Sequence, residues 1–410
     1  MSADPHRLKS AVADRVHGAG ERVRRLSHRI HAHPEIGHEE TQASGWLAEA
    51  LTGEGYTVEL GICDLPTAFR ARIGSGNLNL ALLAEYDALP GIGHACGHNM
   101  IAAASYGAAA ALAEVADDLG LTVTVLGTPA EEVLARGGKI LMLERGGFDG
   151  VHAAVMIHPT PFEAPAPAMI AAETVTVEMI GQAAHAAAAP QRGRNAADAL
   201  TVTQVAIGLL RQHLDSAVRI SGITTAAGDA PNIIPALARA EYILRAPTLA
   251  DLSEVHTRVA ACFEAGALAT GCRAHVSDVN RPYAEIRPDP DLVELYRDNA
   301  TTAGRVFDPD ERLRGFLPSS DAGNVSQVIP TLHPFIGLGT WPVVNHQPEF
   351  ARACATPSAD DALLAGATML AWTAVDVATR PELRRRLTAA APRVARAPAA
   401  TSAHVLTEEE

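Results

Sequence analysis

The chain has 410 residues, of which 48% are hydrophobic and 20% charged, and its formal net charge is −14. This length exceeds the size at which one hydrophobic core keeps growing, so two globular domains are expected, and the composition excludes a disordered chain. The excess of acidic residues disfavours nucleic acid and anionic membranes as partners. The sequence shows no signal-like segment, no membrane span and no paired-cysteine pattern, which predicts a cytoplasmic protein.

The first part of the chain alternates predicted helices and strands. Helices are expected at 6–31, 41–51 and 99–119, and strands at 56–60, 78–84, 121–127 and 153–158. The last three strands each run into polar residues. Such alternation predicts an α/β fold with a mostly parallel sheet and helices on both faces, and sites in such sheets gather beyond the carboxyl ends of the strands.

Between residues 171 and 283 the predicted order changes to βαββαβ, which is typical of a ferredoxin-like unit. Strands are expected at 173–180, 217–226, 237–245 and 273–279, with helices at 195–213 and 248–270. We therefore expect residues 1–170 and 284–390 to form one larger domain, into which 171–283 is inserted as a second domain. The Pro/Ala/Thr-rich segment 391–410 is expected to be disordered.

The heptapeptide GHACGHN, residues 93–99, places two histidines and a cysteine in a loop between a predicted strand and a predicted helix. An extended backbone would turn His94, Cys96 and His98 to one side. Thiolate and imidazole suit zinc or another borderline transition ion. A cysteine nucleophile and a chance cluster remain as alternatives, because one Cys-x-His pair is weak evidence by itself.

Polar residues at the ends of other strands favour the metal. Glu131 and Glu132 are adjacent in GTPAEE, where two anions at the end of an apolar strand call for a cation, and one carboxylate near a metal can act as a general base. His158 follows the next apolar strand, and His346 lies in NHQPEF, far along the sequence. Taken alone, His158 is better explained as a buried structural histidine, and His346 by itself indicates little.

Taken together, the motifs resemble the M20 family of metallopeptidases and amidohydrolases, in the branch with N-acyl-amino-acid and aminobenzoyl-glutamate hydrolases and M20 domain-containing protein 2 dipeptidases. The motifs that carry this resemblance, in chain order, are HAHPEIGHEE (31–40), YDALPGIGHACGHN (86–99), GTPAEE (127–132), IHP (157–159), GQAAHAAAAPQRGRNAADAL (181–200), NIIP (232–235), SSDAGNVS (319–326) and NHQPEF (345–350). The match covers nearly the whole chain.

The resemblance implies a role for each matching position. The metal ligands would be Cys96, His98, Glu132, His158 and His346, with Cys96 bridging two divalent ions. Zinc is expected first, with manganese or cobalt as alternatives. Glu131 would be the general base, and Asp87 would orient a ligand histidine, while His94 would only support the site.

The resemblance also places functional residues in the inserted domain. His185 would donate to the developing oxyanion, often at the site of a neighbouring subunit, and Asn232 would contact the substrate. Asn195 and Arg245 are further candidates for binding the substrate, because a guanidinium can grip a carboxylate with two hydrogen bonds. A homodimer formed through this domain is expected from the family.

The expected function is a metal-dependent amidohydrolase that cleaves an N-acyl-amino acid or a dipeptide by attack of a metal-bound water, with no covalent intermediate. The alternatives are a non-catalytic ligand-binding protein that keeps one structural metal, and a cysteine hydrolase. A structural site would have no use for Glu131, and a cysteine nucleophile would leave the other strand-end residues unexplained.

Overall fold

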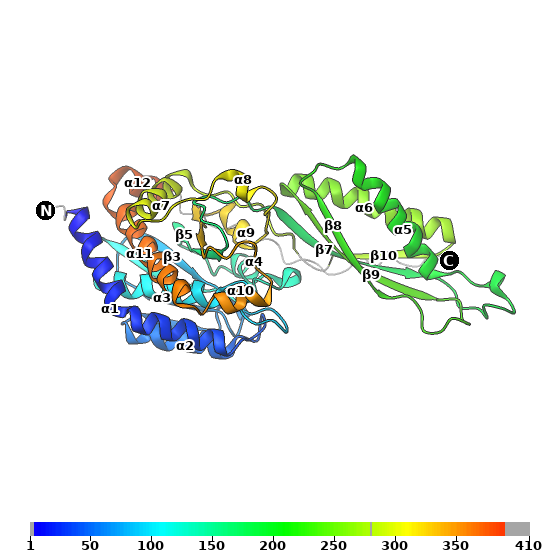
Figure 1. Cartoon of the computed structure of the whole chain (residues 1–410), viewed down its shortest axis with the longest axis horizontal. Coiled ribbons are helices and arrows are strands. Elements are labelled where there is room, and N and C mark those ends of the chain that lie inside the picture. Colours follow the sequence, from blue (N-terminus) through cyan, green and yellow to red (C-terminus); the bar gives the residue numbers. More distant parts are fainter. Residues whose placement is uncertain (1–3, 279–280, 390–410) are drawn as a thin grey trace.

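The computed structural model describes residues 4–278 and 281–389, which fold into two lobes (Figure 1). The larger lobe combines the first part of the chain with the segment that follows residue 283. The smaller lobe, drawn in green, extends from one end of the larger one. The predicted disordered tail, 391–410, lies outside the described residues.

The larger lobe is built on a six-stranded mixed sheet in the order β1-β2-β4-β3-β5-β11. Its strands are β1 (Thr57–Leu60), β2 (Phe69–Ile73), β3 (Leu78–Ala84), β4 (Leu121–Gly127), β5 (Ala153–Val155) and β11 (Thr331–Leu332). β3 pairs in parallel with β4 and β5, and β5 pairs in parallel with β11, whereas β1 and β2 are antiparallel. The carboxyl ends of β3, β4 and β5 therefore meet at one edge.

Helices cover both faces of this sheet, as predicted, because β3 is apolar on both sides. Leu80 and Leu82 pack in one core cluster, and Ala81 and Leu83 pack in another. The first face carries α1 (Pro5–Ala32), α2 (Thr41–Gly53), α3 (His98–Ala113), α7 (Pro290–Thr302) and α11 (Pro357–Thr379), and the second carries α4 (Gly138–Glu144) and α9 (Ala322–Ser326). The shorter helices α8 (Asp310–Leu313), α10 (Pro348–Ala353) and α12 (Pro381–Ala389) complete the lobe.

Among the described helices, α11 alone is long and apolar enough to cross a membrane by length and composition. Most of its apolar stretch is buried, and it packs against α1, α3 and α7. It therefore serves as the central core helix of the larger lobe.

One strand prediction was wrong. The segment 153–158 does not form one strand, because the chain leaves the six-stranded sheet after Val155, and His158 opens the separate strand β6 (His158–Thr160). β6 pairs in parallel with β12 (Phe335–Gly337). The chain leaves the sheet in the same way after β11. A His–Pro step stands at each break, because His158 and Pro159 open β6 whereas His333 and Pro334 directly precede β12, and a proline has no N–H for the ladder.

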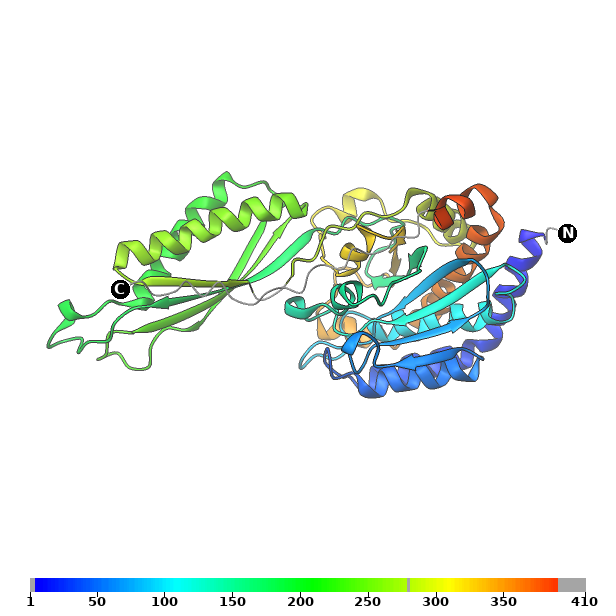
Figure 2. The same ribbon diagram turned by 180° about the vertical axis from the view of Figure 1, so that it is seen from behind.

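The smaller lobe has the predicted βαββαβ order, and Figure 2 shows both of its helices on the same face of its sheet. Its elements are β7 (Ala171–Ile180), α5 (Ala196–Leu210), β8 (Arg219–Ala226), β9 (Leu237–Ala246), α6 (Leu249–Thr270) and β10 (Arg273–Asp278). The four strands form an antiparallel sheet in the order β10-β7-β9-β8. Val175 and Val177 are buried under the helices, whereas Thr174 and Thr176 lie on the open face.

The two lobes are joined where the chain enters and leaves the smaller one. The backbone N–H of Ala172 donates to the carbonyl of Tyr283 at 3.0 Å, and the N–H of Tyr283 donates back at 2.8 Å. The smaller lobe, which we call the lid, is therefore an insertion whose two ends are hydrogen-bonded to each other.

Candidate metal centre

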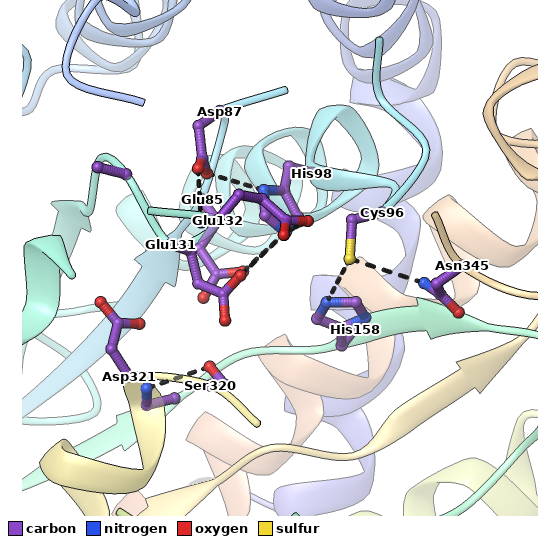
Figure 3. A network of polar contacts seen from close by, with 12 residues as sticks. Glu85, Asp87, Cys96, His98, Glu131, Glu132, His158, Ser320, Asp321 and Asn345 are labelled. Carbon is purple, nitrogen blue, oxygen red and sulfur yellow. Dashed lines mark hydrogen bonds and ion pairs between the residues drawn. The ribbon is translucent and has the colours of Figure 1, made fainter. Parts of the chain in front are cut away.

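The edge formed by β3, β4 and β5 carries most of the residues predicted to bind metal. Figure 3 shows the side chains of Cys96, His98, Glu131, Glu132 and His158 around one space, although they come from three separate loops. In each case the loop begins where a buried strand ends, as expected for parallel strands.

Local backbone geometry turns Cys96 and His98 into this space. Gly97, between them, has a positive φ of 79° and precedes α3. A Cβ at this glycine would lie 2.6 Å from the ring of Pro159, so a larger residue would strain the backbone and clash as well. His94 does not share the space: its buried ring stacks on His31 at 6.2 Å, and burial lowers its pKa to about 3.

The potential ligand atoms form three overlapping groups. They are Cys96 with His98 and His158, Cys96 with Glu132 and His346, and Glu85 with His98 and Glu131, and in each group the ligand atoms lie within 4.8 Å of one another. The Sγ atom of Cys96 lies 3.6 Å from Nε2 of His158, and Nε2 of His346 lies 3.3 Å from a Glu132 oxygen. Cys96 and His98 each belong to two of these groups.

Asp87 holds the side chain of His98 and the backbone of Glu132 in place. Its Oδ1 accepts a hydrogen bond from Nδ1 of His98 at 2.8 Å, and its Oδ2 accepts the backbone N–H of Glu132 at 2.8 Å. The other ring nitrogen of His98 is buried and has no hydrogen-bond partner among the described residues. His98 is thus held with one nitrogen directed at the ligand groups, as in a carboxylate–histidine–metal arrangement.

A buried cation lies below the ligand groups. Nζ of Lys139 lies 2.6 Å from a Glu85 oxygen and 2.6 Å from an Asp321 oxygen, and all three side chains are fully buried. Lys139 thus connects α4 to the end of β3 and to the start of α9. It compensates part of the negative charge that gathers at this edge.

The remaining charge fits divalent cations. Burial, together with Glu85 and Glu132 nearby, raises the pKa of the Glu131 carboxyl well above its ordinary value. Burial and Glu132 likewise raise the pKa of the Cys96 thiol. Divalent cations would stabilise the anionic forms of these groups, and thiolate, imidazole and carboxylate are suitable ligands for zinc. The residues therefore fit a two-metal site by chemistry as well as by spacing.

A cavity of about 320 Å³ opens over the ligand groups, and we call it the metal cavity. Its walls are largely apolar and include Met169, Phe316 and Phe335. Arg245, from the lid strand β9, enters the same cavity and donates a hydrogen bond to Oγ of Ser319 at 2.8 Å. The structure thus brings Arg245 next to the predicted metal ligands.

The other lid candidates are not brought to this cavity within one chain. His185 is exposed and lies beyond the far end of β7, a ten-residue strand of about 30 Å that starts at the larger lobe. The backbone carbonyl of Asn232 accepts a bond from Ala186 in the same region. The Asn195 side chain caps α5 by accepting backbone N–H groups, which gives it a structural role there.

Sequence reasoning missed several residues of the site. His333 is buried, stacks on His158 at 5.6 Å and lines the metal cavity. The signal for it was a second His–Pro step, LHP, like the IHP motif. Glu85 could have been found as the one charge at the end of the apolar run NLNLALLAE. The hydroxyl of Tyr283 donates to the backbone carbonyl of Glu131 at 2.9 Å, and no local pattern indicated this contact.

The fold and the ligand groups together define a metal-dependent hydrolase of C–N bonds. The model of peptidase family M20/M25/M40 matches residues 81–374, and the chain belongs to this family. It is 38% identical over 397 residues to the Xaa-Arg dipeptidase of Mus musculus, a match that covers 93% of this chain and 91% of that protein. It is 34% identical over 284 residues to a p-aminobenzoyl-glutamate hydrolase chain of Escherichia coli, over 63% of this chain and 58% of that one.

Solved structures share the fold at low sequence identity. The aminobenzoyl-glutamate utilization protein of Klebsiella pneumoniae superposes with a TM-score of 0.66 at 19% identity, covering 88% of this chain and 97% of that one. The YXEP protein of Bacillus subtilis, described as a dinuclear metal binding peptidase of family M20, gives a TM-score of 0.63 at 19% identity, covering 88% and 98%. The predicted α/β architecture with its separate lid-like sheet is confirmed.

Proposed function

We propose that this protein is a two-metal amidohydrolase that cleaves the amide bond of a dipeptide or an N-acyl-amino acid. The observation that carries the proposal is the presence of Glu131 in an open cavity, beside ligand groups that share Cys96 and His98. The relative named an Xaa-Arg dipeptidase favours a dipeptide.

Cys96, His98, Glu132, His158 and His346 would hold the two ions, with zinc preferred by the thiolate and imidazoles and with manganese or cobalt as alternatives. Bound divalent ions polarise a substrate carbonyl and make water a better nucleophile near neutral pH. The chain itself supplies the remaining steps.

Glu131 is placed to move the proton. Its carboxylate lies within 3.8 Å of His98 and faces the metal cavity, so it can take a proton from the attacking water and deliver it to the leaving amine. Arg245 would hold the carboxylate of the substrate, because its side chain enters the cavity and has no carboxylate partner among the described residues.

His185 would complete the site from a second copy of the chain. Its position at the far end of the lid fits donation to an oxyanion held by that second copy better than donation within its own chain. A homodimer is therefore part of the proposal, and so is a contact between Asn232 and the substrate. A cytoplasmic location is proposed as well, since all five cysteines are free thiols.

The two rival functions have less support. A binding protein with a structural metal would need a closed ligand set, whereas this cavity is open and contains an unused Glu131. A cysteine hydrolase needs an accessible, low-pKa thiol, whereas burial raises the pKa of Cys96.

The deciding experiment loads the purified protein with zinc, manganese or cobalt and assays it against a panel of dipeptides and N-acyl-amino acids. We expect chelator-sensitive hydrolysis of at least one class, and we expect Glu131→Ala and Glu131→Gln to reduce kcat by at least about a hundredfold while the ions stay bound. Wild-type turnover in either variant would exclude Glu131 as the base. Activity that survives metal removal but not thiol alkylation would instead favour the cysteine hydrolase.

A further inference from the structure

A second cavity adjoins the metal centre on the open face of the lid sheet. This cavity, which we call the lid cavity, has a volume of about 580 Å³. Gly37 and Pro90 of the larger lobe form one wall, and Ile223 and Glu241 of the lid form the opposite one. Glu132 and Leu134 line both the lid cavity and the metal cavity, so the two spaces meet at the loop that carries the general base.

The lid contributes a positively charged side chain to the metal cavity and a negatively charged one to the lid cavity. Of the residues that the structure describes, Arg245 is the one Lys or Arg side chain that lines the metal cavity, and no Lys or Arg lines the lid cavity. Glu241 is the one acidic side chain that the lid contributes to the lid cavity. Among the described residues its carboxylate makes no hydrogen bond and no ion pair, and the neighbouring Arg239 is already paired with Glu178.

Strand geometry relates these two charges. Residues 238, 240, 242 and 244 of β9 are buried against α5 and α6, so Arg245 and Glu241 project from the opposite, open face. Four residues along a strand place their Cα atoms about 13 Å apart. An extended dipeptide spans roughly 7 Å, and a charged contact of about 3 Å at each end brings the total to about 13 Å. Side chains of Arg245 and Glu241 that project in parallel from the same face would therefore hold its two ends.

We infer that Glu241 binds the free α-ammonium group of a dipeptide whose carboxylate is held by Arg245, so that the site selects unblocked dipeptides over N-acyl-amino acids. This inference rests on the proposed function and narrows it to one of its two substrate classes. The amide bond then lies over Glu131, between the two cavities, and the side chain of the leaving residue faces the apolar wall of the metal cavity.

The test compares two substrates that differ only in the amino group, alanyl-leucine and propionyl-leucine. We expect kcat/KM of the metal-loaded wild type to favour alanyl-leucine by at least about tenfold, and Glu241→Gln to reduce this ratio by about tenfold, as for the loss of one charge-assisted contact. Glu264→Gln is the matched control, because Glu264 is an exposed residue of α6, on the other face of the sheet. Its ratio should equal that of the wild type.

Binding gives a readout that does not depend on turnover. In the Glu131→Gln background, calorimetry should detect tighter binding of alanyl-leucine than of propionyl-leucine, and adding Glu241→Gln should remove the difference. An unchanged preference in the Glu241 variants overturns the inference. The inference is also overturned if Glu241→Gln changes only the ratio of kcat/KM for alanyl-arginine to that for alanyl-citrulline. That result would place Glu241 next to the side chain of the leaving residue. Absence of turnover with the binding difference intact would overturn the proposed function alone.

Discussion

Replacing Asp87 with asparagine tests whether the carboxylate behind His98 sets metal affinity. One oxygen of Asp87 accepts from His98 and the other accepts from the backbone of Glu132, each at 2.8 Å. The amide of asparagine keeps one acceptor and replaces the other with a donor, so one of the two contacts is lost together with the negative charge. Losing a contact of this kind to a ligand histidine lowers metal affinity by about 10- to 100-fold, equivalent to roughly 1.4–2.7 kcal/mol.

The assay is competition for zinc between the protein and a chromophoric chelator, with circular dichroism as a check on folding. Asp117→Asn provides the matched control, because Asp117 is exposed and, among the described residues, its side chain accepts hydrogen bonds only from Ser75, away from the ligand groups. We expect the control to bind zinc as the wild type does. If Asp87→Asn binds zinc within threefold of the wild type, Asp87 does not position the ligands in the way described.

Three further predictions concern buried groups. Lys139→Met leaves Glu85 and Asp321 buried without their cation, so it should lower the free energy of unfolding, measured in urea, by about 3–5 kcal/mol. Replacing both acids with their amides in this variant should restore part of the stability, whereas an unfolding midpoint equal to that of the wild type would contradict the prediction. Burial raises the pKa of Glu40 to about 7, so the folded state retains a proton that the unfolded state loses, and the wild type loses stability as pH rises from about 4.5 to 7. The difference in the free energy of unfolding between Glu40→Gln and the wild type should therefore shift in favour of the variant by up to about 3 kcal/mol from pH 4 to pH 8. The same difference at both pH values would refute the raised pKa of Glu40. By elemental analysis, Cys96→Asp should retain two metal ions and Cys96→Ala should lose at least one, because aspartate can still bridge two ions and alanine cannot. Two ions bound to Cys96→Ala would exclude a bridging role for Cys96.

The ligand groups could be predicted because they depend on short-range rules. Buried strands are apolar and contiguous in the sequence, parallel strands end at a common edge, and polar residues just after such strands must therefore meet. This reasoning, together with the motifs, placed Cys96, His98, Glu132 and His158 in one region, where the structure brings them together. The βαββαβ order of the lid was equally legible, since its helices and strands have distinct periodicities.

Other features of the site depend on contacts between distant parts of the chain, which local patterns do not determine. Lys139 looks like an ordinary charged residue of a short helix, and only the fold shows that it is enclosed by Glu85 and Asp321. His94 stands two residues from Cys96, but a backbone turn, which the residue types do not specify, directs it toward His31. The position of His185 depends on the length and direction of a lid whose orientation no local pattern encodes.

The hydrogen-bonded junction at Ala172 and Tyr283 connects the smaller lobe to the loop that carries Glu131. Tyr283 belongs to this junction through its backbone and holds the carbonyl of Glu131 through its hydroxyl. A rotation of the lid about the junction would therefore shift the tyrosine ring and the base together.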